Sequence, residues 1–123
     1  MNKIKISRTR MTPYIYFNPS RGKLRIRGRS SPENSLDLFG PLIRALECWT
    51  NINPNIVVDF KLDYFNSSST KCLFMIFKRL NELQSRGHTV RVNWHAYEFD
   101  EDVIEAGEDF EEMTELKFTY ILF

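Results

Sequence analysis

The chain has 123 residues, of which 42% are apolar and ten are phenylalanine, so one hydrophobic core can form and a second domain has no room. We therefore expect a single domain over residues 1–123. The net charge is only +1, which argues against the strongly basic composition typical of nucleic-acid-binding domains. Apolar runs in the sequence are short, and the basic N-terminal segment is not followed by one, so we expect neither a membrane span nor a secretory signal. We therefore expect a cytoplasmic protein.

The charges are unevenly distributed along the chain. Nine of the seventeen Lys and Arg fall in residues 1–29, where there is no Asp or Glu. Ten of the sixteen acidic residues fall in residues 98–115, where there is no Lys or Arg. This pattern indicates complementary faces, either within the fold or toward a partner.

Two short segments near the N-terminus predict a β-hairpin. Residues 14–18 are aromatic and β-branched, the following Pro and Gly favour a turn, and residues 23–28 alternate basic and apolar side chains. Leu24 and Ile26 should face the core, and the basic side chains between them should face solvent.

The middle of the chain predicts a helix and then a strand. Apolar residues from Leu36 follow a helical period, with Ser35 as the candidate N-cap. Because proline favours a first turn, either a helix begins at Pro41 after a turn, or one helix is kinked there. Residues 55–64 begin with an unbroken apolar run, which predicts a central strand buried on both faces at its start.

Residues 68–86 carry the strongest helical stripe, and Gly87 is a natural residue to end it. Residues 90–95 alternate and predict a strand, residues 98–113 a short acidic helix, and residues 116–123 a final strand. The predicted fold is α/β, in the order β-β-α-β-α-β-α-β. This is a mixed β-sheet with covering helices and right-handed crossovers between the later parallel strands.

Four consecutive hydroxyl residues follow Asn66, between the central strand and the long helix: Ser67, Ser68, Ser69 and Thr70. Ligands often bind at the carboxyl ends of strands in open α/β sheets, and the first turn of a helix stabilises a phosphate. A phosphoserine would add about −1.5 to −2 charges there and could change partner binding without refolding the domain. Composition alone favours a simpler role, in which Ser67 or Ser68 caps the helix, although capping needs only one hydroxyl.

Three segments, in order and spanning nearly the whole chain, resemble the SiaC family of bacterial regulatory phosphoproteins. They are Ile26–Asn34 with its GRSSPEN sequence, Asp59–Lys71 with YFNSSSTK, and the acidic Asp100–Phe110. That family in turn looks like a relative of the STAS anti-sigma-factor antagonists such as SpoIIAA. The resemblance therefore implies a STAS-like sheet with covering helices, in the order predicted above.

The resemblance also implies a partner switch and not an enzyme. A dedicated kinase, similar to SiaB, would phosphorylate a hydroxyl at the start of the long helix. A PP2C-type phosphatase, similar to SiaA, would remove the phosphate. Only the unmodified form would then bind and regulate a target such as a diguanylate cyclase.

The antagonists' Asp-Ser-Ser-Gly pattern lies over residues 66–69, which implies Ser67 as the phosphate acceptor. Asn66 replaces their Asp and Ser69 their Gly, so Ser68 remains the second choice, with Ser69 and Thr70 behind it. Arginine suits bidentate phosphate recognition, which makes Arg27 and Arg29 candidate phosphate contacts. Both also fit an ordinary strand end, and Asn34 fits an ordinary helix cap. The residues expected to contact the partner or the phosphate are Arg27, Arg29, Asn34, Asn66 and Lys71.

A second hypothesis is a nucleic-acid-binding module that uses the basic hairpin, with Tyr14, Tyr16 and Phe17 stacking on bases. The near-neutral net charge makes this interpretation weaker, because alternating aromatic residues in a hairpin more often pack in a core. An enzyme ranks third, since no nucleophile, base and orienting group can be assembled.

No cofactor or metal is expected from the cysteines and histidines. Cys48 and Cys72 lie in predicted helices without CxxC spacing, and we expect buried free thiols. His88 and His95 show neither HExxH nor triad spacing, so we expect solvated or hydrogen-bonded imidazoles.

Overall fold

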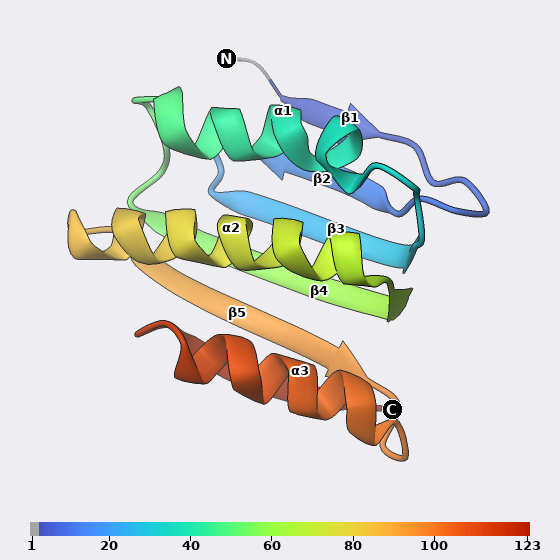
Figure 1. The fold of residues 1–123 in the computed structure, drawn as a ribbon. Helices are drawn as coiled ribbons and strands as arrows, with labels where there is room; N and C mark the ends of the chain where they lie inside the picture. The colour runs from blue at the N-terminus through green and yellow to red at the C-terminus, as the bar shows by residue number, and fades with distance from the viewer. Residues whose placement is uncertain (1–2) are drawn as a thin grey trace.

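The computed structural model describes residues 3–123 and shows a six-stranded sheet with three helices packed against it (Figure 1). The strands are β1 Ile4–Ile6, β2 Tyr14–Asn18, β3 Lys23–Ser30, β4 Asn55–Phe65, β5 Thr89–Ala96 and β6 Lys117–Leu122. The helices are α1 Ser35–Cys48, α2 Ser67–Ser85 and α3 Glu101–Glu112.

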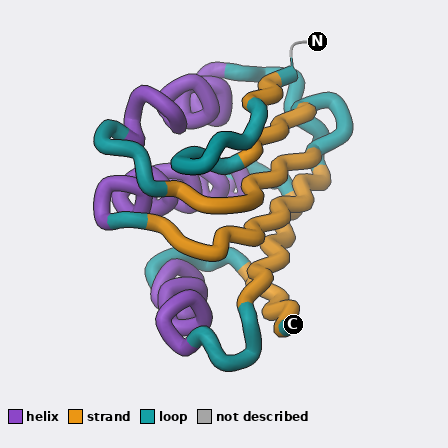
Figure 2. Tube along the Cα trace, turned by 90° about the vertical axis from the view of Figure 1, so that its right-hand side faces the viewer, coloured by secondary structure: helices purple, strands orange, loops and turns teal. Residues whose placement is uncertain are grey.

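The strands lie in the sheet in the same order as in the chain. β1, β2 and β3 are antiparallel neighbours, whereas β3 to β6 are parallel and are joined by the three helices. Right-handed crossovers that always advance in one direction place their helices on one face of a sheet. Figure 2 shows this arrangement from the side, with the helices covering one face and the other face open.

The expected mixed sheet with covering helices is confirmed, and two details are corrected. The order gains β1, a strand of three residues that pairs Ile4 with Phe17 and Ile6 with Ile15. The start of β4 is buried on one face only, because no helix covers the other face. Val57 there is 38% exposed.

α1 is one continuous helix with Pro41 inside it, so the alternative in which a helix begins at Pro41 is wrong. Proline has no N–H, so the helix lacks the hydrogen bond that residue 41 would donate to the Asp37 carbonyl. Its N-cap is Asn34, whose side chain accepts a hydrogen bond from the Leu36 N–H at 3.2 Å, and not the predicted Ser35. α2 ends before Gly87 as expected, and this glycine has a φ of 104°.

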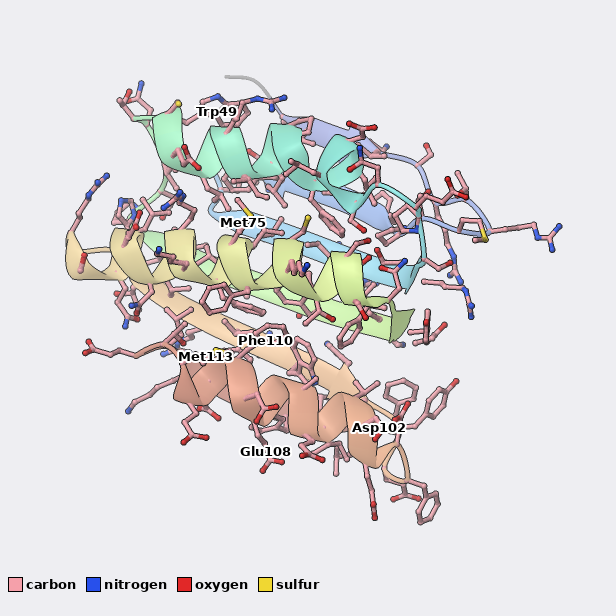
Figure 3. The ribbon with its side chains drawn as sticks, in the orientation of Figure 1. Trp49, Met75, Asp102, Glu108, Phe110 and Met113 are labelled. Atoms are coloured by element: carbon pink, nitrogen blue, oxygen red, sulfur yellow. The ribbon has the colours of Figure 1, made fainter. Side chains whose placement is uncertain are left out.

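The core lies between the sheet and the helices, and Leu24 and Ile26 are fully buried in it as predicted. Trp94 of β5 is at its centre, in contact with aromatic rings from β4, α2, α3 and β6. Its indole N–H donates to the Val103 carbonyl at 2.9 Å. Figure 3 shows Phe110 of α3 pointing into this layer and Glu108 pointing away from it.

The two cysteines differ. Cys72 is buried as expected, and burial raises the pKa of its thiol, so the reactive thiolate is disfavoured. Cys48 is exposed, so the expectation of a buried thiol is wrong for this residue. It is exposed because it is the last residue of α1 and lies beyond the buried stripe of the helix. None of the helices in residues 3–123 combines the length and hydropathy needed to cross a membrane.

Candidate functional site

The candidate site lies at the edge of the sheet where β3 and β4 end and where α1 and α2 begin (Figure 1). A single residue, Asn66, separates β4 from α2. Its backbone N–H donates to the Ser30 carbonyl at 3.0 Å, and its side-chain amide donates to the Pro32 carbonyl at 2.9 Å. Asn66 therefore holds the start of α2 against the loop that leads into α1.

Asn66 is also the N-cap of α2, since its Oδ1 accepts a hydrogen bond from the Ser69 N–H at 2.9 Å. The simpler interpretation from sequence, in which Ser67 or Ser68 caps the helix, is therefore wrong. Because the Asn66 amide oxygen accepts from this N–H of the first turn, the serine hydroxyls are free for other contacts.

Four serines form a hydrogen-bonded group, called here the hydroxyl cluster: Ser30, Ser35, Ser68 and Ser69. The Ser69 hydroxyl lies 2.6 Å from that of Ser30 and 2.9 Å from that of Ser35. The Ser35 hydroxyl also lies 2.6 Å from that of Ser68. Ser30, Ser35 and Ser69 are buried, so the cluster links β3, α1 and α2 in the interior.

Ser67 is outside this cluster. It is exposed, and its hydroxyl forms no hydrogen bond with any group in residues 3–123. Thr70 is exposed as well, but its hydroxyl donates to the Asn66 carbonyl at 3.1 Å. The four hydroxyls of residues 67–70 look equivalent in sequence, whereas in the structure only Ser67 is both exposed and without a hydrogen bond.

The surroundings of Ser67 favour an anion. The first N–H groups of a helix have no partner in the preceding turn and carry partial positive charge. Here the starts of α1 and α2 adjoin, as the Ser35–Ser68 hydrogen bond shows. Lys71 is exposed and lies four residues after Ser67, which places both side chains on the same side of α2.

The structure brings together some of the predicted contact residues and separates others. Asn34, Asn66 and Lys71 lie at the two helix starts. Arg29 is at the end of β3, with its guanidinium over the Tyr64 ring at 4.5 Å from the centroid. Arg27 lies on the open face of the sheet, opposite the helices, since its neighbours in sequence, Ile26 and Gly28, are buried.

Sequence reasoning missed the contacts of Ser30 and Ser35, and Ser35 was expected only as a helix N-cap. Their hydrogen-bond partners are 33 to 39 residues away in the chain, so no local spacing reveals the contact. Both lie within or beside the GRSSPEN segment, whose resemblance pointed to this region without assigning them a role.

The histidines have ordinary partners. Nδ1 of His88 lies 3.0 Å from the Asn53 carbonyl oxygen, and Nε2 of His95 lies 3.6 Å from Oδ1 of Asp59 on the neighbouring strand. Within residues 3–123, no group of three or more His, Cys, Asp or Glu side chains is placed to hold a metal ion.

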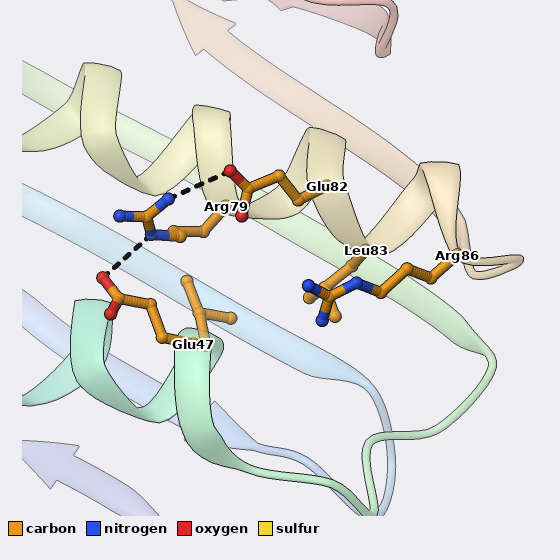
Figure 4. Close-up of a pocket in the computed structure, with 6 residues that line it drawn as sticks. Glu47, Arg79, Glu82, Leu83 and Arg86 are labelled. Carbon is orange, nitrogen blue, oxygen red and sulfur yellow. Dashed lines mark hydrogen bonds and ion pairs between the residues drawn. The ribbon is translucent and has the colours of Figure 1, made fainter.

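A pocket lies between the C-terminal halves of α1 and α2 (Figure 4). Arg79 bridges its two sides by pairing with Glu47 at 2.8 Å and with Glu82 at 3.0 Å. The hydrogen bond to Glu47 is the main reason that the pKa of Arg79 is raised, which keeps the guanidinium charged. This pocket is at the opposite end of α2 from Ser67, and its ion pairs link the two helices.

Comparison with known proteins agrees with these features. The family model of the SiaC family regulatory phosphoproteins matches residues 6–123. The chain belongs to the SiaC family. A protein of Pseudomonas aeruginosa strain UCBPP-PA14, itself uncharacterised, is 34% identical over 113 residues, which are 91% of this chain and 90% of that protein.

Solved SiaC structures share the whole fold. Apo-SiaC from Pseudomonas aeruginosa has a TM-score of 0.87 and 32% identity, covering 98% of this chain and 99% of that one. A SiaC chain crystallised with the Pseudomonas aeruginosa diguanylate cyclase SiaD, of which it is the activator, has a TM-score of 0.88, 32% identity and the same coverage. The family resemblance and the fold expected from sequence are thereby confirmed.

Proposed function

We propose that this chain is a non-enzymatic, single-domain partner switch of the cytoplasm whose acceptor is Ser67. In its unmodified form it binds and regulates a diguanylate cyclase. Phosphorylation of Ser67 by a SiaB-like kinase ends that binding, and a SiaA-like PP2C-type phosphatase restores it. Support for the cyclase as partner comes from SiaC of Pseudomonas aeruginosa, which is 32% identical and is the activator of SiaD.

The observation that carries the choice of acceptor is the contrast between Ser67 and its neighbours. Ser69 is fully buried and Ser68 is hydrogen-bonded to Ser35, so phosphate on either would break the hydroxyl cluster. Ser67 can be modified without breaking any hydrogen bond among the described residues. Thr70 is exposed, but its hydroxyl is bonded to the helix backbone.

The chemistry requires an external kinase. The Ser67 oxygen attacks the γ-phosphorus of ATP, a new O–P bond forms, the bond to ADP breaks, and the hydroxyl proton passes to a base. No Asp, Glu or His of residues 3–123 forms a hydrogen bond with Ser67, so the kinase must supply that base. The phosphatase reverses the change by hydrolysis, which returns the serine and inorganic phosphate.

The phosphate would be retained at the surface by local charge. Lys71 and the N-terminal ends of α1 and α2 stabilise a dianion here, so the modified side chain stays folded back near the helix start. The added bulk and about −1.5 to −2 charges then occupy the surface formed by the start of α2 and the adjoining loops. A partner that docks there in the unmodified state is displaced without any change in the core.

Mass spectrometry after incubation with a SiaB-like kinase and ATP tests the acceptor. We expect one phosphate, on the peptide that contains residue 67, and none in the Ser67→Ala variant. Thr70→Ala is the matched control, because it removes the other exposed hydroxyl of the first turn, and it should be phosphorylated like the wild type. Full phosphorylation of Ser67→Ala would reject Ser67 as the acceptor.

Calorimetric titration with a SiaD-like diguanylate cyclase tests the switch. Ser67→Ala should bind like the wild type, because no partner of its hydroxyl is lost. Ser67→Asp and the phosphorylated wild type should bind more weakly, since both add charge at the contact. Equal affinity of the phosphorylated and unmodified wild-type proteins would contradict the switch.

A further inference from the structure

The open face of the sheet collects cations from five of its strands. Side chains on this face come from the strand positions that alternate with the buried ones. The eight Lys and Arg among them are Lys5, Lys23, Arg25, Arg27, Arg29, Lys61, Arg91 and Lys117. Only two carboxylates, Asp59 and Asp63, accompany them, so this surface, called here the basic face, carries a large positive excess.

These cations are not neutralised within the fold. All ion pairs in residues 3–123 involve either Arg79, on the helical layer, or His95. On the basic face, Asp59 instead accepts a hydrogen bond from Asn93 at 3.1 Å and lies beside His95. The net charge of +1 therefore conceals a basic sheet face and an acidic α3, and the basic face is available to an anionic partner from outside.

Two tyrosines lie among the cations, whereas Phe17, the third aromatic residue expected to stack on bases, is fully buried in the core. Tyr14 and Tyr16 are on β2 with parallel rings, 3° apart in plane and 6.4 Å between centroids. In the sheet register Tyr16 is beside Arg25, and Tyr14 is beside Arg27, which is itself beside Lys61. Half-buried aromatic rings flanked by cations on an open sheet form a surface on which bases can stack while phosphates are bound alongside.

A shallow basic pocket lies beside Arg27 and Lys61 on this face. Arg8, Arg27 and Lys61 line it, together with Gly28 and one carboxylate, Asp63. A Cβ on Gly28 would lie 3.0 Å from Nε of Arg8, so the absent side chain lets this arginine lie against the strand. Gly28 also has a φ of 118°, which favours glycine there. The pocket gives the basic face a recessed position suited to a phosphate group.

We propose that the basic face binds single-stranded nucleic acid, with phosphates on the Lys and Arg side chains and bases stacked on the two tyrosines. This is a second activity, separate from the proposed switch, since Ser67 lies on the helical layer. An anionic membrane fits less well, because the large exposed apolar residues on this face are few among residues 3–123: Val57, Ile121 and Phe123, whose ring lies beside the Lys61 ammonium. An acidic protein would pair with the cations but would leave the tyrosines without a role.

Fluorescence anisotropy of a labelled oligouridylate of about 12 nucleotides tests the proposal at about 50 mM salt, with the corresponding DNA in parallel. We expect saturable binding that weakens steeply as salt rises. Replacing Arg27 and Lys61 together by Gln removes two phosphate contacts, so the slope of log K against log salt should become shallower by about 1.4. The matched control, Lys78→Gln with Arg86→Gln, removes two cations from α2 and its C-cap and should leave binding unchanged.

Tyr16→Ala should weaken binding about fivefold or more while leaving the salt slope unchanged, because stacking releases no counterions. Ser67→Ala should bind as the wild type does, which separates this activity from the switch. Lack of saturable binding to both oligonucleotides would overturn the proposal. So would an equal loss in the Lys78/Arg86 control, or binding of vesicles containing phosphatidylserine in place of oligonucleotide.

Discussion

The distinction between Ser69 and Ser67 can be measured as a difference in stability. Among residues 3–123, Ser69→Ala deletes the only side-chain partner of the buried Ser30 hydroxyl and one of the two hydroxyl partners of Ser35. A buried polar group left without a partner costs about 1–3 kcal/mol, and the better helix propensity of alanine returns about 0.5 kcal/mol. We therefore expect Ser69→Ala to lower the free energy of unfolding by about 1–2.5 kcal/mol.

Ser67→Ala is the matched comparison, since it removes a hydroxyl from the same helical turn without breaking a hydrogen bond. An exposed substitution of this kind changes stability by less than about 0.5 kcal/mol. Urea unfolding followed by tryptophan fluorescence gives both values, provided that the slope m stays constant between variants. Trp94, buried in the core, should report the global transition.

A double-mutant cycle makes the test sharper. Replacing both Ser30 and Ser69 by Ala removes the two partners together, so the double variant should lose less stability than the sum of the single variants. The coupling should be on the order of 1 kcal/mol. The reasoning is refuted if Ser69→Ala and Ser67→Ala have the same stability, or if the two single losses are simply additive.

Three further predictions concern other parts of the fold. Gly107→Ala would place a Cβ 2.6 Å from Nε1 of Trp94, so overpacking and strain on the indole hydrogen bond should lower the free energy of unfolding by about 1–3 kcal/mol, even after the gain in helix propensity. Glu108→Ala is the control on the same helix, and a Gly107→Ala variant more stable than the wild type would contradict this packing. Burial, together with the hydrogen bond to Glu111, raises the pKa of Tyr120, so the folded state keeps this proton longer than the unfolded state, whose pKa is about 10. The contribution of Tyr120 to the free energy of unfolding should therefore be fully present below about pH 10 and decrease above it. Tyr120→Phe should make this decrease less steep in urea titrations at increasing pH, and an unchanged pH dependence would show that Tyr120 is not its source. Arg79→Ala should lower the free energy of unfolding by about 1 kcal/mol, and by less at high salt, whereas Lys78→Ala should change it little. A loss of stability that does not depend on salt would show that packing, not charge, links the two helices.

Local pattern was sufficient where an element has a strong period of its own. The apolar stripe of α2, the alternation of β5 and the glycine at position 87 are properties of neighbouring residues, and each was predicted close to its observed position. β1 was missed because three residues carry too little alternation to be distinguished from a basic tail. Its strand conformation depends on pairing with β2.

The remaining errors come from information that is not local. Whether Val57 is covered depends on the side of the sheet to which the helices cross, and this follows from the strand order of the whole chain. The hydroxyls of residues 67–70 could not be ranked, since the partners of Ser68 and Ser69 come from residues 30–35. The capping role of Asn66 was missed for a related reason, because the sequence offers five consecutive polar residues that could all begin a helix.

The order of the strands also explains how the two proposed activities can occupy separate surfaces of the fold. A sheet whose crossovers all advance in one direction has one face covered by helices and one face open, and its helix starts all lie along one edge. Ser67 lies at that edge, where Asn66 takes over capping and leaves the serine free to be modified. The basic side chains of β3 alternate with core residues and must therefore point to the open face, whereas the acidic residues of α3 lie with the helices. The uneven charge along the chain thus becomes a separation of charge between two surfaces, so a phosphate on Ser67 changes the helical edge and leaves the open face of the sheet as it was.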